Sequence, residues 1–519
     1  MDEIKDHSCS DSGCNRRDFL KKAACVSTAA PLLINCRRED QREQIKRNIV
    51  LILVDDMRFD AMSCLGHPVL DTPNFDHLVN GGTLFSNAFV TTSLCSPSRA
   101  SILSGLYAHQ HQVLDNNTEF DSSLPSFPPM LQQRGYRTGF IGKWHMGGSK
   151  DSPRPGFDRW VSFRGQGVYF NPRFNVDGSY VEHEGYTTDL LTDYAEKFIR
   201  ESRREPFFLY LSHKAVHDDF QPAPRHRGKY RDIEVPYPPS YADTEENYRG
   251  KPGWLRSARK SCIGVDHMYD NRYGLEQFYK DYCECLLAVD DSVGRVLKVL
   301  EDENLLEDTI ILFAGDNGFL CGEHGLIDKR NMYEPSIRIP LVAYSPGMIP
   351  SGKIREELAL NIDLCPTILE LAGVEPFKDN SGSSLLGLAS GNDAPWRKEF
   401  LYEYFWERNY PQNPSVLGLR TDRYSYMRYH GIWDVNELYD IQRDPHQLDN
   451  LLGDYALSTE VRVENSFPED SHPASRNIPN SLIGDPELMK LVCELEERLF
   501  NIIESTGGIT EPTWSALKK

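Results

Sequence analysis

The sequence predicts an α/β sandwich, in which helices flank a large, mostly parallel sheet and a smaller antiparallel sheet lies near the C-terminus. Short apolar runs rich in β-branched residues recur at 48–54, 138–141, 206–211, 309–314 and 339–344. Helix-like segments separate or follow them at 76–80, 186–200, 277–303 and 363–371. Unbroken apolar runs fit strands that are buried on both faces, and their alternation with helices is the order of a parallel sheet.

A different pattern begins after Leu386. Short aromatic runs at 399–406 and 424–429 precede a polar stretch through Pro479 and an amphipathic run at 486–505. This predicts a small antiparallel sheet with a terminal helix packed on it. We therefore expect a large domain at 47–385 and a C-terminal subdomain at 386–519. Residues 218–260 are rich in Pro, Tyr, Arg and Lys, and they form either part of a substrate pocket or an irregular surface insertion.

The composition excludes some classes of function. The chain has 57 basic and 77 acidic residues and a net charge of -20, which argues against non-specific nucleic-acid binding. An anionic substrate must therefore find a local basic pocket. The 12 cysteines show neither the density of a disulfide scaffold nor the spacing of a zinc site.

The N-terminal 36 residues are expected to be an export signal, followed by a charged linker at 37–46. Adjacent Arg16 and Arg17 precede an apolar run at 23–34 that is too short to span a bilayer. This order resembles a bacterial twin-arginine signal, although a basic surface turn before a short helix is the alternative. The string 33–36 is similar to a lipoprotein cleavage box, which would anchor Cys36 to lipid. Asn35 replaces the usual small residue there and favours plain periplasmic or extracellular export. No other stretch is apolar enough for a membrane helix.

Carboxylates follow two predicted strands at the points where the strands end. Asp55 and Asp56 come directly after the run at 48–54, and Asp316 and Asn317 follow the run at 309–314 after one glycine. Open α/β sheets bind ligands at the carboxyl ends of their strands, so these side chains could converge. An Asp pair alone is more often a cap or a turn. The repeated ending favours a calcium or magnesium site, because carboxylate and amide oxygens are hard ligands.

Basic side chains follow two further predicted strands. The run at 138–141 leads to Lys143 and His145, and the run at 206–211 leads to His213 and His217. Lys143 could hold an anionic oxygen, and His145 or His217 could transfer a proton, because imidazole titrates near neutral pH. A lone histidine is more often structural. Acids and bases at four strand ends together indicate an active site at this edge of the sheet.

The string Cys95-Ser96-Pro97-Ser98-Arg99 leads into a short predicted helix that Gly105 ends. Cys95 would stand just before a helix N-terminus, where backbone N–H groups favour an anion. A cysteine alone would be an ordinary buried residue. The whole string, with Leu103-Ser104-Gly105 after it, resembles the signature of the formylglycine sulfatases, in which the cysteine is oxidised to an aldehyde by a formylglycine-generating or equivalent maturation enzyme.

The resemblance covers residue 48 to about residue 372 and, more weakly, the C-terminal part. It implies an alkaline-phosphatase-like sandwich that hydrolyses sulfate esters through a formylglycine gem-diol and a covalent sulfoenzyme. It also implies a calcium ion held by the residue at position 95 and four oxygen ligands: Asp55, Asp56, Asp316 and Asn317. By the same matching, Arg99 and Lys143 stabilise the formylglycine and the sulfate, His145 contacts the hydrated aldehyde, and Lys329 is the second sulfate-binding lysine.

Three histidines have less certain places in this pattern. His217 falls where the family has a leaving-group histidine, which usually follows Pro, but Val216 stands there in this chain. His213 therefore competes with His217 for the role of general acid. His324 either faces the substrate or has a structural role in its loop.

The resemblance implies a sulfated carbohydrate as substrate. The strings at 327–330 and 361–364 are similar to those of N-acetylglucosamine-6-sulfatases that act on heparan-type glycans. Iduronate-2-sulfatases and algal-polysaccharide sulfatases share enough of the pattern to stay open. Two other classes are alternatives: a phosphodiesterase or phosphonate monoester hydrolase of the same superfold, and a catalytically inactive glycan-binding relative.

Overall fold

The computed structural model describes residues 46–430, 434–453 and 485–508. The predicted export signal lies outside the described residues, as do residues 37–45 of the linker. The chain from Arg47 onward forms one compact unit, and the description below is confined to it. Within the described ranges, no helix combines the length and the apolar character needed to cross a bilayer.

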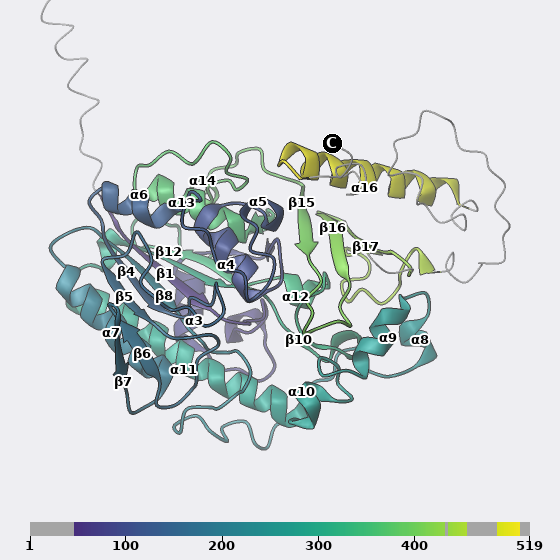
Figure 1. Ribbon diagram of the computed structural model, residues 1–519, viewed down its shortest axis with the longest axis horizontal. Coiled ribbons are helices and arrows are strands. Elements are labelled where there is room, and N and C mark those ends of the chain that lie inside the picture. Colours follow the sequence, from purple (N-terminus) through teal and green to yellow (C-terminus); the bar gives the residue numbers. More distant parts are fainter. Residues whose placement is uncertain (1–45, 431–433, 454–484, 509–519) are drawn as a thin grey trace, which may run out of the picture. The chain divides into compact units, whose positions relative to one another are not determined.

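A ten-stranded mixed sheet forms the centre of this unit (Figure 1). The five inner strands, β9-β1-β8-β4-β5, are all parallel, whereas β12 and the β6-β7 hairpin pair antiparallel to their neighbours. In the order in which they lie across the sheet, the strands are β13 (Lys353–Arg355), β2 (Thr83–Phe85), β12 (Leu341–Tyr344), β9 (Thr309–Gly315), β1 (Asn48–Val54), β8 (Phe207–Ser212), β4 (Arg137–Gly142), β5 (Arg159–Ser162), β6 (Arg173–Val176) and β7 (Ser179–Glu182). The predicted large and mostly parallel sheet is thus confirmed.

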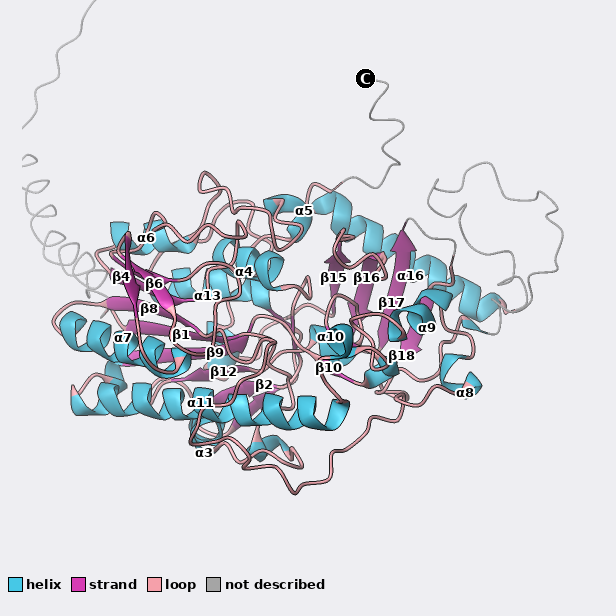
Figure 2. Ribbon diagram, turned by 60° about the horizontal axis from the view of Figure 1, so that its bottom comes forward, coloured by secondary structure: helices cyan, strands magenta, loops and turns pink. Residues whose placement is uncertain are grey.

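Helices cover both faces of this sheet, as Figure 2 shows. One face carries α3 (Pro73–Gly81), α7 (Thr187–Ser202) and α11 (Leu275–Asp302), and the other carries α4 (Cys95–Ser104), α6 (Phe127–Gln133) and α13 (Leu364–Leu371). Strand β1 divides the core accordingly, because alternate side chains of a strand point to opposite faces. Leu51 packs into the core beneath α4 and α13, whereas Ile52 packs into the core beneath α7 and α11. Both faces are therefore buried, as the unbroken apolar run at 48–54 predicts.

The smaller sheet is antiparallel throughout and consists of β15 (Glu399–Tyr404), β16 (Ser415–Thr421), β17 (Tyr424–His430) and β18 (Glu437–Asp440). Helix α16 (Pro486–Ser505) packs on β15 and β16, as predicted. This sheet shares an apolar core with the α4 face of the large sheet, and the rings of Phe89 and Phe400 lie 5.0 Å apart between them. The position of the domain boundary near residue 385 stays a prediction.

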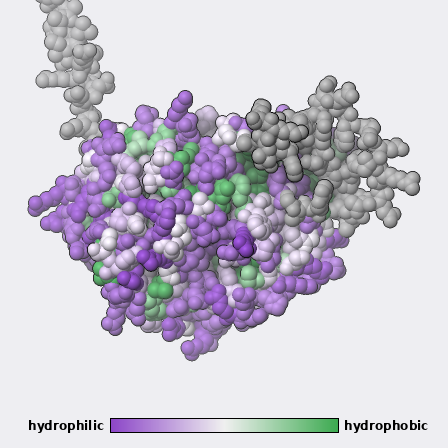
Figure 3. Space-filling view, viewed as in Figure 1, coloured by the Kyte–Doolittle hydropathy of each residue, from purple (hydrophilic) through white to green (hydrophobic). Residues whose placement is uncertain are grey.

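The remaining α-helices and strand pairs are short. They are α5 (Ala108–His111), α8 (Glu245–Tyr248), α9 (Gly253–Arg259), α10 (Met268–Asn271), α12 (Glu334–Ile337) and α14 (Leu386–Ala389), with the strand pairs β3 (Ala88–Phe89) with β14 (Ala359–Leu360) and β10 (Leu320–Cys321) with β11 (Ile327–Asp328). Hydrophilic residues predominate on the face in Figure 3, as the charge-rich composition leads one to expect.

Glycine at the end of β4 lets two strand ends meet closely. Gly142 has φ 126°, and a Cβ atom at this position would lie 1.7 Å from the backbone oxygen of Ser212. Only a residue without a side chain fits such a close approach at positive φ. The next residue, Lys143, then donates its backbone N–H to Ser212 O at 2.8 Å. The chain after β4 and the chain after β8 are thereby held side by side at the edge of the sheet.

Candidate functional site

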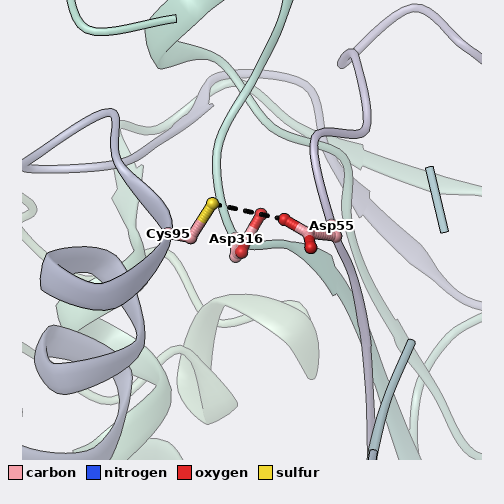
Figure 4. A group of neighbouring side chains, drawn as sticks. All are labelled: Asp55, Cys95 and Asp316. Carbon is pink, nitrogen blue, oxygen red and sulfur yellow. Dashed lines mark hydrogen bonds between the residues drawn. The ribbon is translucent and has the colours of Figure 1, made fainter. Parts of the chain in front are cut away.

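The candidate site lies at the carboxyl ends of four parallel strands and at the first turn of α4. Strand β1 delivers Asp55 and Asp56, β9 delivers Asp316 and Asn317, β4 delivers Lys143, and β8 delivers the segment that contains His217. Asp55, Cys95 and Asp316 face one another (Figure 4), and one ligand atom from each lies within 4.8 Å of the others. The structure thus brings together side chains that are more than 200 residues apart in the sequence.

Cys95 is the first residue of α4 rather than the residue before it. The helix ends at Gly105, whose φ of 70° is the left-handed conformation usual for a helix stop. The Cys95 thiol is buried and donates to Asp55 Oδ1 at 3.4 Å. Burial, reinforced by the negative charge of Asp55, raises its pKa well above the ordinary value. An unmodified Cys95 is therefore a neutral thiol at physiological pH and a poor nucleophile.

Each buried carboxylate of the site is matched by a cation. Arg99 pairs with Asp316 at 2.8 Å, and Lys329 pairs with Asp56 at 2.6 Å. Lys143 pairs with Asp55. Arg99 also donates Nη1 to Lys143 O and to Ser212 Oγ, each at 2.6 Å, so the guanidinium ties α4 to the ends of β4 and β8.

The three carboxyl groups nevertheless have different proton affinities. Burial favours the neutral form of Asp55, but the cations Lys143 and Arg99 outweigh it and hold its pKa well below the ordinary value. Burial and the charge of Asp55 raise the pKa of Asp56 to about 6 and that of Asp316 to about 7. The raised pKa values show that the nearby cations do not fully compensate the negative charges of Asp56 and Asp316, because both carboxylates are buried close to Asp55.

Asn317 supplies an oxygen that the described protein groups leave unused. Its side-chain nitrogen donates to Asp56 Oδ1 at 2.6 Å and to Gly318 O at 2.9 Å. Its Oδ1 is buried and, among the described residues, accepts no hydrogen bond. A buried polar atom without a partner is costly. This acceptor lies beside three carboxylates, of which Asp56 and Asp316 are not fully compensated by the local cations, and the set fits a hard divalent cation such as calcium.

His145 and His217 both lie beside this cluster. The ring nitrogen Nδ1 of His145 is 3.4 Å from Ser96 Oγ, and His145 occupies a left-handed backbone conformation. His217 Nε2 lies 3.9 Å from Asp56 Oδ2, while its Nδ1 lies 2.5 Å from the backbone oxygen of Asp218. Because a carbonyl only accepts, Nδ1 must carry a proton, so Nε2 is the atom that faces the carboxylates. Burial, Lys329 and Lys143 hold the pKa of His217 well below its ordinary value.

His213 faces away from the cluster. Its ring contacts Ser292 of α11 at 3.2 Å, and burial lowers its pKa to about 3. His324 is also buried, where it stacks on Tyr333 and contacts Lys251 Nζ at 3.2 Å. It borders a cavity of about 310 Å³ that residues 236–240 help to line. The 218–260 segment thus borders a cavity, but this cavity is not lined by the carboxylate cluster.

The structure adds site residues that the sequence did not single out. Ser212 accepts from Arg99, and Ser96 contacts His145. Tyr282 of α11 donates to the backbone oxygen of Asp56 at 3.0 Å and accepts from the backbone N–H of Arg58 at 2.9 Å, which fixes the turn after β1. Ser212 could have been found from its place at the end of a predicted strand. Tyr282 gives no local signal, because it lies in the middle of a long amphipathic helix.

A parallel sheet whose strand ends gather carboxylates, lysines and histidines is the architecture of an α/β enzyme. The model of the sulfatase family matches residues 47–374, and the model described as N-sulphoglucosamine sulphohydrolase, C-terminal, matches residues 322–465. The chain therefore belongs to the sulfatase family.

Individual relatives agree with this assignment. An N-acetylglucosamine-6-O-sulfatase of Bacteroides thetaiotaomicron is 32% identical over 82% of this chain and 86% of its own length. The human N-acetylglucosamine-6-sulfatase is 30% identical over 78% of this chain and 80% of its own length. A structure solved with its substrate D-glucosamine-2-N,6-O-disulfate has 29% identity and a TM-score of 0.77, and the match covers 89% of this chain and 98% of that one.

The raised pKa of Asp316 predicts a pH-dependent difference in stability between the metal-free protein and its Asp316→Asn variant. The folded-state pKa of about 7 exceeds the unfolded value of about 3.9, so Asp316 stabilises the fold at low pH and loses this contribution as pH rises through about 7. Asn does not titrate. The thermal midpoint of the variant should therefore rise relative to the parent between about pH 4 and about pH 7.

Asp60→Asn is the matched control. Although burial opposes it, Arg58 lowers the pKa of Asp60, so this variant should lose stability relative to the parent above the folded-state pKa. Parallel curves for Asp316→Asn and its parent across the window would contradict the assigned environment of Asp316.

Proposed function

We propose that this sulfatase hydrolyses sulfate esters on a glycosaminoglycan sugar similar to N-acetylglucosamine 6-sulfate. The observation that carries the proposal is the buried cluster in which Cys95, Asp55 and Asp316 face one another beside Arg99 and Lys143. The names of the relatives from Bacteroides thetaiotaomicron and human, and the disulfated glucosamine in the related structure, support the choice of sugar.

The proposal includes conversion of Cys95 to formylglycine by a maturation enzyme. Its chemical support is that the buried thiol is neutral and that its neighbours suit an oxygen nucleophile. The hydrated aldehyde would supply the attacking oxygen, which a thiol lacks. Arg99, held by Asp316, Ser212 and Lys143 O, keeps a fixed positive charge beside residue 95. His145 contacts Ser96, the residue after Cys95, and would hydrogen-bond the hydrate.

Calcium is the proposed cation, held by Asp55, Asp56, Asp316, Asn317 and the residue at position 95. It would supply positive charge that favours ionisation of the attacking hydroxyl and stabilises sulfate oxygens. The free oxygen of Asn317 and the raised pKa values of Asp56 and Asp316 support this ligand set. All five positions offer hard oxygen ligands once Cys95 is converted.

The remaining charged groups would act on the ester. Lys143 and Lys329, paired here with Asp55 and Asp56, can donate to sulfuryl oxygens and neutralise the charge that develops on them. His217 would protonate the departing sugar oxygen through Nε2. An anionic ester beside the ring raises the pKa of His217, so binding of the substrate favours the protonated form that is needed.

Export by the twin-arginine route is proposed as well, with lipid anchoring at Cys36 as the less favoured variant. A double replacement, Arg16→Lys with Arg17→Lys, should leave unprocessed precursor in the cytoplasm, because both arginines define the signal. Fractionation of cells followed by immunoblotting measures this. Unchanged export would refute the twin-arginine assignment.

For Cys95, mass spectrometry of the peptide that contains it should show the aldehyde in active preparations. Cys95→Ala should lower turnover of an aryl sulfate by at least about 10³-fold, because the attacking oxygen is lost. A matched aryl phosphate tests the phosphonate and phosphodiesterase alternative in the same preparations. Full activity with an unmodified Cys95 would overturn the mechanism.

Calcium should stabilise the chelated protein and restore its activity. At about 100 times its Kd, the ion should add about 2.7 kcal/mol to the free energy of unfolding. At a fixed calcium concentration, the gain should grow from about pH 5 to about pH 8, because protonated Asp56 and Asp316 compete with the ion at the lower pH. Differential scanning calorimetry of the parent and of Asp316→Ala measures the stabilisation and its dependence on pH, and an aryl sulfate assay measures the restored activity. Restoration by zinc alone would show that the ligand assignment is wrong.

The role of His217 can be tested by comparing substrates whose leaving groups differ in their need for a proton. His217→Ala should lower kcat/KM on a sugar sulfate by about 10² to 10⁴-fold, and far less on a nitrophenyl sulfate, since only the sugar alkoxide needs a proton. His213→Ala is the control and should show no such dependence on the substrate. Equal losses on both substrates would instead assign His217 to sulfate binding or to folding.

A further inference from the structure

Lys214 is a buried lysine beside the site that has no role in the chemistry above. It follows β8 by two residues and is only 3% exposed. Among the described residues it has no carboxylate partner, unlike Lys143 and Lys329, which both pair with aspartates. Burying an ammonium group without a counter-ion costs free energy, so the position of this one calls for an explanation.

The ammonium group of Lys214 is instead directed at the backbone around His217. Nζ lies 3.5 Å from His217 O and 3.4 Å from Asp218 O, and it lies 4.1 Å from the centre of the Tyr169 ring. The three N–H donors of Lys214 are therefore directed at two carbonyl oxygens and the face of the Tyr169 ring, all of which attract an ammonium group that lacks a carboxylate partner. Burial and the charge of Lys143 lower the pKa of Lys214 to about 8, so the group remains mostly cationic at neutral pH.

One of these two carbonyl groups sets the state of the His217 ring. Asp218 O lies 2.5 Å from His217 Nδ1 and therefore accepts the Nδ1 proton, which leaves Nε2 as the nitrogen that faces Asp56. The other carbonyl, His217 O, also accepts from the Tyr169 hydroxyl at 2.7 Å. Lys214 and Tyr169 together hold the backbone on which the direction and the tautomer of the imidazole depend.

From this geometry we infer that Lys214 is a positioning residue for His217, with Tyr169 as its support. It fixes the two carbonyl groups so that the proton stays on Nδ1, where it is donated to Asp218 O, and Nε2 stays aimed at the departing oxygen. The inference rests on the proposed role of His217 as proton donor, and it adds a residue that the proposed chemistry does not otherwise use.

Other contacts anchor the same segment without touching these carbonyl groups. Arg272 pairs with Asp218 and Asp219, at 3.0 and 3.1 Å, and His213 contacts Ser292 on α11. The segment therefore has independent anchors on both sides of His217. Loss of the Lys214 ammonium should misdirect the imidazole while the fold persists, which gives the inference a distinctive kinetic signature.

The test compares Lys214→Met, His217→Ala and the double variant on N-acetylglucosamine 6-sulfate and on nitrophenyl sulfate. Met keeps the apolar stem and removes the donors. We expect Lys214→Met to lower kcat/KM on the sugar sulfate by about 10 to 10²-fold more than on the aryl sulfate, and Lys214→Arg to recover part of the loss. In the His217→Ala background, Lys214→Met should cost less than about 3-fold on the sugar sulfate, because the two residues act as one unit.

Ser292→Ala is the matched control, since it loosens the same segment on the far side of His213. It should lower the thermal midpoint and affect both substrates equally. If Lys214→Met does not fold, Tyr169→Phe replaces it, because this change removes a donor to His217 O and keeps the ring under Lys214.

Equal losses on the two substrates for Lys214→Met, or losses that multiply with those of His217→Ala, would overturn this inference while the role of His217 stands. If His217→Ala itself shows no dependence on the leaving group, the proton-donor role fails first and the inference fails with it. The single variant His217→Ala thus shows whether the proton-donor role has failed, and Lys214→Met with the double variant shows whether the positioning role has failed.

Discussion

The constraint on which the rest of the site depends is the crowding of three carboxylates in one buried volume. Asp55, Asp56 and Asp316 have no access to solvent, and the backbone N–H of Asp56 donates to Asp316 Oδ1 at 3.1 Å. Carboxylates this close cannot all stay ionised without matching positive charge. Arg99, Lys143 and Lys329 supply part of that charge, and each cation comes from a different part of the fold.

The arrangement of the strands, rather than the reach of flexible side chains, brings these charges together. Parallel pairing sets β1 between β8 and β9, so the residues that follow each strand emerge at the same edge. The bare backbone of Gly142 then lets the chain after β4 lie against Ser212, and Arg99 bonds to both strand ends through Ser212 Oγ and Lys143 O. The buried strands β1 and β9 are fixed by core packing. The side chains of Asp55, Asp56, Asp316 and Asn317, which follow these strands, are therefore held in fixed positions.

The features that could be predicted are those marked by a pattern of neighbouring residues in the sequence. Unbroken apolar runs revealed β1 and β9, and the acids directly after them indicated the cluster. The hairpin β6-β7 was missed because its strands have four residues each and the outer one is exposed. The difference between His213 and His217 had no local signal either, since it is decided by Ser292, which lies 79 residues from His213 on α11. Lys214 in a polar string looks like a solvated side chain until Tyr169 and the two carbonyl groups are seen around it.

The charge balance also explains why positioning should matter more for His217 than for the lysines. Lys143 and Lys329 are drawn to their partners by full charges in a medium of low polarity, so their direction tolerates small shifts of the backbone. Among the described residues, the His217 ring has no charged partner at such short range: its Nε2 is 3.9 Å from Asp56, and its short contact is to the neutral carbonyl of Asp218. Proton transfer requires a well-aligned donor within hydrogen-bonding reach. A group that is held by its own backbone depends on whatever fixes the carbonyl groups of that backbone, and at His217 and Asp218 these contacts come from Lys214 and Tyr169.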